Sequence, residues 1–119
     1  MVHDFQPGDY LIFQIESGYG LLRVLGVEES GAEVVWHLTA YSDLFLDPDM
    51  ADAALENAAG LTIAKAHIAL TNRAFESTQV ARMGNAPLTE SESDQIRKWG
   101  EVPGREIHDR SIRLLLGLR

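Results

Sequence analysis

The chain has 119 residues and a mass of 13.2 kDa, which is enough for one hydrophobic core and too little for two. Hydrophobic residues make up 45% of it and charged residues 24%, which excludes a disordered chain. The net charge of −8 opposes binding to a bare phosphate backbone, and the lack of cysteine excludes disulfides, thiolate nucleophiles and cysteine metal sites.

The first predicted elements are three strands joined by short turns. Residues 9–16, 21–28 and 32–41 are rich in β-forming side chains, and apolar and polar residues largely alternate along them. Glycines stand at both breaks, in Gly18-Tyr-Gly20 and in Ser30-Gly31, where tight turns are expected. The pattern predicts an antiparallel meander, and its short spacing favours a strongly curved sheet.

A helix is predicted over residues 48–59. Asp47 is placed to cap the first turn and Pro48 suits the first helical position. The stretch holds five alanines, and Gly60 is expected to end it. Its apolar stripe is thin, and we expect it to consist mainly of Met50, Ala54 and Leu55.

The second half of the chain is less regular. Residues 61–70 return to strand character, 72–75 are undecided, and 76–87 are expected to be a loop. A capping box at Thr89 and Glu92 predicts a helix over 90–99 that ends at Gly100.

The C-terminal segment 105–119 is too apolar to stay in water, so Ser111–Leu116 is expected to dock into the core. Whether it is strand or helix, and whether it exchanges between subunits, stays open. The fold class predicted is therefore α+β: residues 1–119 as a single domain, a small antiparallel curved sheet or SH3-like half-barrel, with two short helices.

The charge is unevenly distributed. Residues 1–70 hold eleven acidic and two basic residues, whereas 71–119 hold seven acidic and eight basic ones. One interpretation is a solvated helix face; the other is a patch that binds a basic protein partner. The candidate binding residues are Asp43, Asp47, Asp49, Asp52 and Glu56.

A pocket or an aromatic platform on the early sheet is the alternative site. His37 and His67 fall on predicted strands and could meet, with Asp43 or Asp109 as a third ligand, but no metal-binding spacing is present. We therefore predict no metal and no cofactor, and no catalytic residue is assigned. The residues of this alternative site are Tyr10, Tyr19, Arg23, Trp36 and His37.

Arginines concentrate near the end of the chain, at positions 97, 105, 110, 113 and 119. Oligonucleotide binding by this tail is a third hypothesis, because arginine forks suit phosphate. The acidic balance disfavours nucleic acid, and the simpler expectation is that these arginines pair within the chain with the surplus acids of its first half.

The opening Phe5-Gln-Pro-Gly-Asp9, Gly18-Tyr-Gly20 and Leu22-Arg23-Val24-Leu25 resembles the start of the Imm26-type bacterial immunity proteins, over about twenty residues. The resemblance implies a protein that neutralises a toxin by binding it.

Residues and resemblance together favour a non-catalytic binding module, either an immunity or a regulatory protein, over a small ligand-binding or enzymatic barrel. No signal peptide is visible and no apolar run could span a bilayer. We expect a cytoplasmic protein without membrane contact; homo-oligomerisation stays open.

Overall fold

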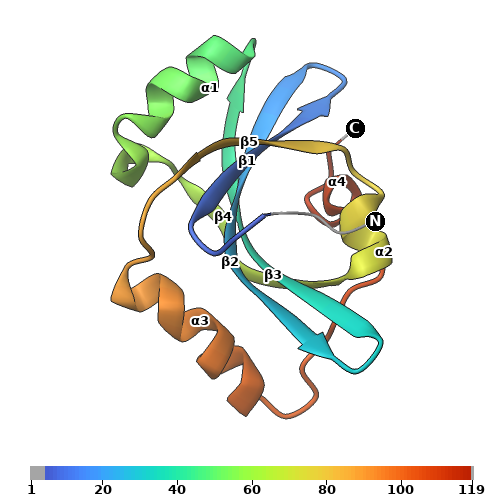
Figure 1. The fold of residues 1–119 in the computed structure, drawn as a ribbon. Coiled ribbons are helices and arrows are strands. Elements are labelled where there is room, and N and C mark those ends of the chain that lie inside the picture. Colours follow the sequence, from blue (N-terminus) through green and yellow to red (C-terminus); the bar gives the residue numbers. More distant parts are fainter. Residues whose placement is uncertain (1–4, 119) are drawn as a thin grey trace.

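Five antiparallel strands form one curved sheet in the computed structural model, which describes residues 5–118 (Figure 1). The predicted meander is confirmed: β1 (Asp9–Ile15), β2 (Gly18–Ser30) and β3 (Glu33–Phe45) pair in sequence order. Gly31, at a φ of 63°, occupies the left-handed conformation needed in the tight turn between β2 and β3.

The sheet is extended on both sides, in the order β4-β3-β2-β1-β5. The strand β4 (Ile63–Thr71) was expected, but β5 (Val80–Asn85) lies where a loop was predicted. That prediction was wrong because β5 alternates poorly and is fixed by its antiparallel pairing with β1. The two edge strands do not pair with each other, so the sheet stays open. Register shifts in the β2–β3, β3–β4 and β1–β5 ladders bend it.

The helix α1 (Pro48–Leu55) begins as predicted, since the Asp47 side chain accepts a 2.8 Å hydrogen bond from the backbone N–H of Met50. It ends earlier than expected, and a separate 3-10 turn, η1 (Ala58–Gly60), follows it. The predicted apolar stripe is right in part: Ala54 and Leu55 are half-buried, but about half of Met50 is exposed, and the fully buried residue of the helix is Ala51.

The number of helices also exceeds the predicted two. The predicted capping box starts α3 (Glu90–Glu101), which continues through Gly100. The undecided segment begins a short helix, α2 (Asn72–Glu76), and the C-terminal segment docks through another, α4 (Ile112–Leu115). The fold class α+β with a small antiparallel sheet is therefore confirmed, with four short α-helices in residues 5–118.

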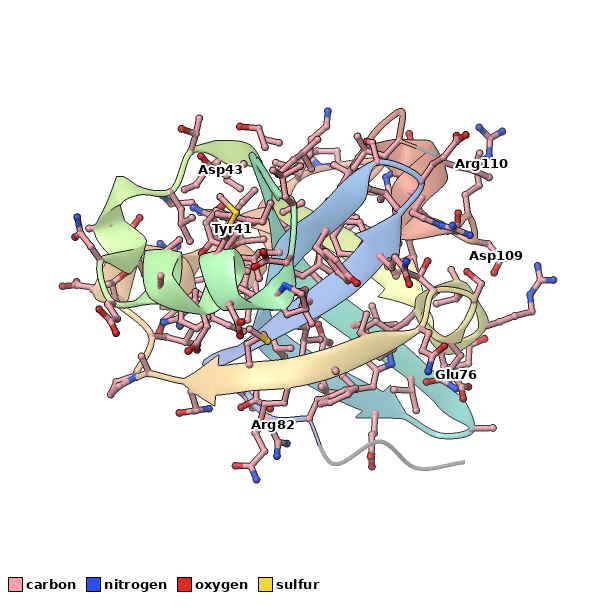
Figure 2. All side chains as sticks on the ribbon, turned by 90° about the horizontal axis from the view of Figure 1, so that it is seen from above. Tyr41, Asp43, Glu76, Arg82, Asp109 and Arg110 are labelled. Atoms are coloured by element: carbon pink, nitrogen blue, oxygen red, sulfur yellow. The ribbon has the colours of Figure 1, made fainter. Side chains whose placement is uncertain are left out.

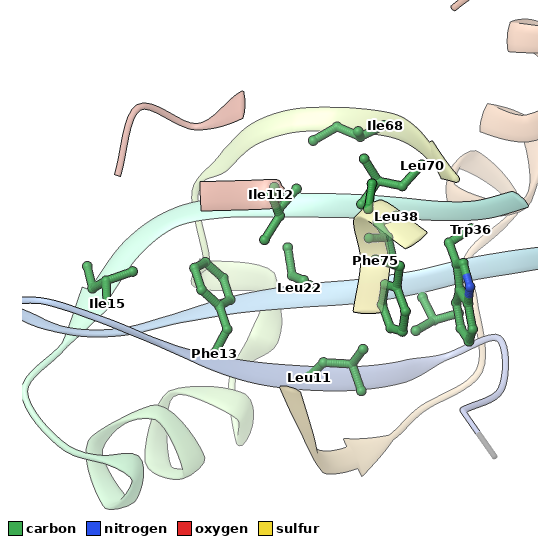
Figure 3. Close-up of a cluster of buried hydrophobic side chains, with 13 residues drawn as sticks. Leu11, Phe13, Ile15, Leu22, Trp36, Leu38, Ile68, Leu70, Phe75 and Ile112 are labelled. Atoms are coloured by element: carbon green, nitrogen blue, oxygen red, sulfur yellow. The ribbon is translucent and has the colours of Figure 1, made fainter. Parts of the chain in front are cut away.

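The two faces of the sheet are covered differently. The helices α2 and α4 lie on one side and α1 and α3 on the other (Figure 1). The first side, here called the apolar face, is closed by a continuous hydrophobic cluster (Figure 3). In this cluster the ring of Phe75 stacks on that of Trp36 at 3.9 Å, and Ile112 of α4 is buried. Its buried members are Leu11, Phe13, Ile15, Leu22, Val24, Trp36, Leu38, Ala40, Ile68, Leu70, Ala74, Phe75 and Ile112.

The opposite side, here called the polar face, has a smaller apolar cluster beneath α1 and several buried polar groups beneath α3. Tyr10, Leu21 and Tyr41 pack with Ala51 of α1. Farther along, Gly26 leaves room for α3, because a Cβ atom there would lie 2.6 Å from Cδ1 of Ile96. The candidate functional groups therefore gather on the polar face.

Candidate functional site

The five predicted acidic residues divide into two groups. Asp47 caps α1, and the Asp43 carboxylate accepts a 2.6 Å hydrogen bond from the backbone N–H of Thr62. In Figure 2, Asp43 lies beside α1, well away from Asp109 and Arg110. These two carboxylates stabilise local backbone and are only secondary candidates for binding a partner.

The other three, Asp49, Asp52 and Glu56, are exposed and form no ion pair with any residue in 5–118. Their helical spacing places them opposite Ala51, the residue that α1 buries. Next to them are two exposed apolar side chains: Leu46 is 77% exposed and Met50 48%. We call these five residues the α1 face: Leu46, Asp49, Met50, Asp52 and Glu56.

The predicted pocket residues do not form one open site. Tyr10, Arg23, Trp36 and His37 are buried and Tyr19 is half-buried. Trp36 belongs to the cluster on the apolar face, whereas Tyr10 and Arg23 lie on the polar face. They provide no shared exposed platform for stacking.

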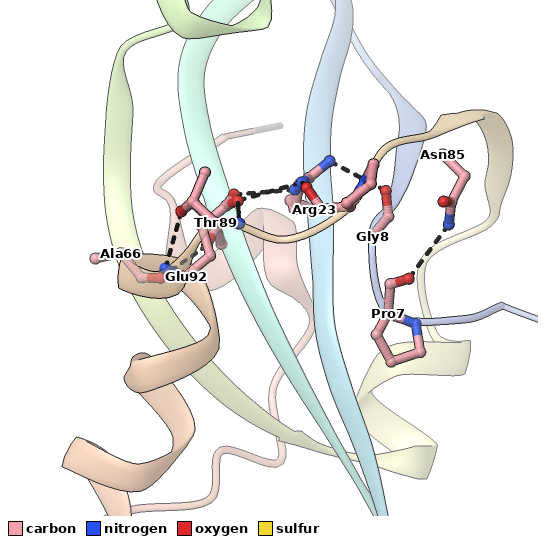
Figure 4. Close-up of polar contacts among 9 residues, drawn as sticks. Pro7, Gly8, Arg23, Ala66, Asn85, Thr89 and Glu92 are labelled. Atoms are coloured by element: carbon pink, nitrogen blue, oxygen red, sulfur yellow. Dashed lines mark hydrogen bonds and ion pairs between the residues drawn. The ribbon is translucent and has the colours of Figure 1, made fainter.

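Arg23 is instead the centre of a closed structural network (Figure 4). Its Nε and Nη2 atoms donate to the two carboxylate oxygens of Glu92 at 2.9 and 3.2 Å. The carbonyl oxygens of Gly8 and Pro87 accept further bonds at 3.1 and 3.0 Å. The guanidinium also lies over the Tyr10 ring at 4.2 Å. Every nitrogen of the guanidinium is occupied, so Arg23 holds the start of α3 to β2 and is not available to a ligand.

Glu92 is matched to this role. Burial alone would raise the pKa of its carboxyl, but the backbone N–H of Thr89 and the Arg23 guanidinium together hold it below its usual value. Burial, with Tyr10 close by, raises the pKa of the Tyr41 hydroxyl. Neither group titrates near neutral pH.

A cluster of titratable groups lies beneath the C-terminal half of α3. Its centre is the buried His37 on β3, whose Nδ1 lies 2.8 Å from Nε2 of His67 on β4. On its other side, His37 Nε2 is hydrogen-bonded to a carboxylate oxygen of Glu28 on β2. The indole of Trp99 covers both imidazoles, at centroid distances of 5.0 and 5.6 Å. We call Glu28, His37 and His67 the histidine relay.

The two histidines thus meet, but not with the ligands considered from sequence. Asp109 binds Thr71 and Arg73, and Asp43 binds a backbone amide. Within residues 5–118, no group of three or more histidine, aspartate or glutamate side chains is arranged to hold a metal ion. The ring centroids of His37 and His67 lie 5.0 Å apart with nitrogens 2.8 Å apart, so the N···N line runs close to the line between the centroids. That alignment suits an N–H···N hydrogen bond.

The relay fixes its own tautomers. An ionised carboxylate only accepts, so His37 donates from Nε2 to Glu28. In neutral His37 this leaves Nδ1 as an acceptor, and His67 must then donate from Nε2. Neutral His67 consequently carries its lone pair at Nδ1, which has no hydrogen-bond partner among the described residues and is not sealed from solvent.

Burial keeps both histidines neutral. It lowers the pKa of His37, although Glu28 opposes the effect. Burial, together with the neighbouring His37, lowers the pKa of His67 to about 4. At neutral pH the relay therefore holds one proton between the two rings and presents an unprotonated nitrogen at its outer end.

The arginine-rich segment does not form a single basic surface. Arg97 pairs with Asp94 and Glu101, and Arg73 pairs with Asp109. Arg105 lies over the Trp99 ring at 5.2 Å and forms no ion pair within residues 5–118. Arg113 is a half-buried residue of α4. Arg119 lies outside the described residues. Arg97 thus pairs with acids of its own helix and not, as expected, with the acidic first half of the chain.

Searches for similar proteins gave no matching family model, no matching curated protein and no matching solved structure. In the part of the chain that the structure describes, no helix is long and apolar enough to cross a membrane. Function must therefore be argued from the geometry of the chain itself.

Proposed function

We propose that this protein is a non-catalytic binding module that captures a basic protein partner through the α1 face. The observation that carries the proposal is that Asp49, Asp52 and Glu56 stand exposed on one side of α1 without an internal counter-charge. Carboxylates placed in this way speed association with a cationic surface and fix the orientation in which the partner docks.

The apolar residues beside these acids support the same function. Leu46 and Met50 expose most or half of their side chains at the start of α1. An apolar centre with a charged rim is the usual anatomy of a protein interface, and methionine is enriched there. An immunity protein that covers a basic toxin would use such a face, as would a regulatory module; the resemblance of the N-terminal residues to Imm26-type proteins favours the first.

The proposal can be tested with an oligolysine peptide as the probe, in titrations at low and high salt. We expect the triple variant D49N/D52N/E56Q to bind at least about tenfold more weakly than the native chain at low salt. The matched control E16Q/E29Q/E33Q removes the same charge from exposed positions elsewhere, and its affinity for the peptide should decrease much less. Equal losses in both variants would mean that net charge alone acts, and the α1 face would be rejected as the site.

The apolar residues of the α1 face are tested separately. The affinity of Leu46→Ser and Met50→Ser is measured for whichever basic partner is captured. Both side chains are exposed, so the fold should tolerate the changes. A loss of affinity that persists at high salt is the expected result, because salt screens only the electrostatic part. Unchanged affinity would remove Leu46 and Met50 from the interface.

A further inference from the structure

A hollow of about 290 Å³ lies between the end of α3 and the segment that follows it. His67, Trp99, Arg105, Glu106 and His108 are among its lining residues. Its position is fixed by the backbone, because the N–H of His108 donates to the carbonyl of Ala69 on β4, and His108 accepts from the N–H of Thr71. We call it the α3–tail hollow; it is separate from the α1 face.

His67 and Arg105 both line this hollow, and within residues 5–118 each carries a group without a hydrogen-bond or ion-pair partner. One is the His67 Nδ1 lone pair at the outer end of the relay, which accepts no hydrogen bond from a described residue. The other is the Arg105 guanidinium, which rests on Trp99 but forms no ion pair within residues 5–118. An acceptor and a cation with nothing to bind define the complementary ligand: a donor and an anion.

The other charged groups of the hollow do not satisfy these two. The carboxylate of Glu106 lies 3.8 Å from Nδ1 of His108, and the indole N–H of Trp99 donates to the Glu106 backbone carbonyl at 3.2 Å. Glu28 is bonded to His37, on the far side of the relay from His67 Nδ1. The relay itself prevents His67 from donating through Nδ1, so the ligand must supply the proton of that hydrogen bond.

We propose that the α3–tail hollow binds a small organic anion that carries a hydroxyl group, with the hydroxyl donating to His67 Nδ1 and the anionic group pairing with Arg105. The volume is at the lower end of ligand sites and suits a molecule of a few heavy atoms. A 2-hydroxy carboxylate is the simplest compound with both groups. The relay makes the acceptor specific, because a shift of the proton to Nδ1 would break the His37–His67 bond.

The first measurement uses the free protein. Nitrogen chemical shifts of the imidazoles should show His67 protonated at Nε2 and unprotonated at Nδ1 near neutral pH. In Glu28→Gln the preference should weaken, since a neutral amide no longer requires a donor at His37 Nε2. If His67 is protonated at Nδ1 in the native chain, the acceptor does not exist and the proposal fails.

The second measurement is a titration with lactate, followed through the ring nitrogens of His67 and the indole N–H of Trp99. Propionate is the matched control, because it keeps the carboxylate and lacks the hydroxyl. We expect lactate to bind about tenfold more tightly than propionate, the value of one well-placed hydrogen bond. Equal affinities, or no saturable shift with either, would overturn the proposal.

Two arginine variants locate the anionic end. Arg105→Ala should weaken the binding of lactate and of propionate alike. Arg110→Ala removes a neighbouring exposed cation that does not line the hollow, so it should leave both affinities unchanged. Both positions are exposed, so neither change should unfold the chain. Equal effects of the two variants would show attraction to overall charge rather than a site.

Discussion

The two faces of the sheet use buried residues for different purposes. On the apolar face, the buried side chains are hydrocarbon or aromatic and contact one another around Phe75, Trp36 and Leu38. On the polar face, helix α3 is held over a buried arginine and two histidines, each with specific partners. Apolar contacts stabilise without direction, whereas the polar groups require partners at fixed places.

This difference shows where function can be located. A ligand at the well-packed apolar cluster would have to displace buried apolar contacts, which costs stability. On the polar side, within residues 5–118, three carboxylates of α1 form no ion pair, His67 Nδ1 accepts no hydrogen bond, and Arg105 contacts the Trp99 ring but forms no ion pair. Both of our proposals therefore fall on that face, at its two ends.

The largest effect should come from the apolar face. Phe75→Ala removes a buried ring that stacks on Trp36, and we expect the free energy of unfolding to fall by about 3–5 kcal/mol. Urea unfolding measures it. The exposed Leu114→Ala on α4 is the control and should change stability by less than about 0.5 kcal/mol. A loss below about 1 kcal/mol for Phe75→Ala would show that this face does not dominate stability.

A smaller decrease in the free energy of unfolding is expected from Arg23→Met. The substitution keeps an apolar stem, but it removes the donor that binds the Glu92 carboxylate and two backbone carbonyls. Because Glu92 is still partly solvated, we expect about 2–4 kcal/mol. Glu92→Gln should cost less, since its amide oxygen can still accept from Arg23. If Arg23→Met unfolds at the same urea concentration as the native chain, the buried network contributes no net stability.

The pH dependence should be the smallest effect. The pKa of His67 falls from 6.5 to about 4 on folding, so between these values the unfolded chain binds more protons. The free energy of unfolding should therefore decrease by about 1–3 kcal/mol as the pH drops from 6.5 to 4. The carboxyl groups with lowered pKa, such as those of Asp9 and Glu92, act mainly below this window.

His67→Gln separates this contribution from the rest. The Gln amide can still donate to His37 but does not titrate, so the decrease should shrink, while His108→Gln should leave it as it is. A native profile that is flat from pH 6.5 to pH 4 would contradict the buried neutral relay.

Sequence alone predicted the elements that local signals define. The glycine turns and the alternating residues between them predicted β1 to β3. Asp47-Pro48 predicted the start of α1, and the capping box of Thr89 and Glu92 predicted α3. The strand β5 was not predicted, residues 72–75 were undecided, and the docked segment Ser111–Leu116 was left open between strand and helix. These elements are short, so local signals are weak and neighbouring elements fix their conformation. Their positions are decided by tertiary contacts.

Glu28 shows the same limit within the site. The ladder pairs Ser30 with Glu33 and Gly26 with His37, which places Glu28 diagonally across from His37 on the same face. The two-residue turn at Gly31 sets this register of β2 against β3. A slip of one residue would move Glu28 to the other face. The joining of His67 and Trp99 to this pair depends on long-range packing that the sequence pattern does not specify.

The backbone of His108 forms a parallel β-bridge with Leu70 on the edge strand β4, 38 residues earlier in the chain. The meander closes through neighbouring hairpins, whereas this parallel contact requires a long loop to close first. During synthesis, the β1–β3 meander can pair while residues 104–108 are still inside the ribosome. The α3–tail hollow forms only once His108 reaches β4, so a nascent chain whose meander has already paired does not yet have it.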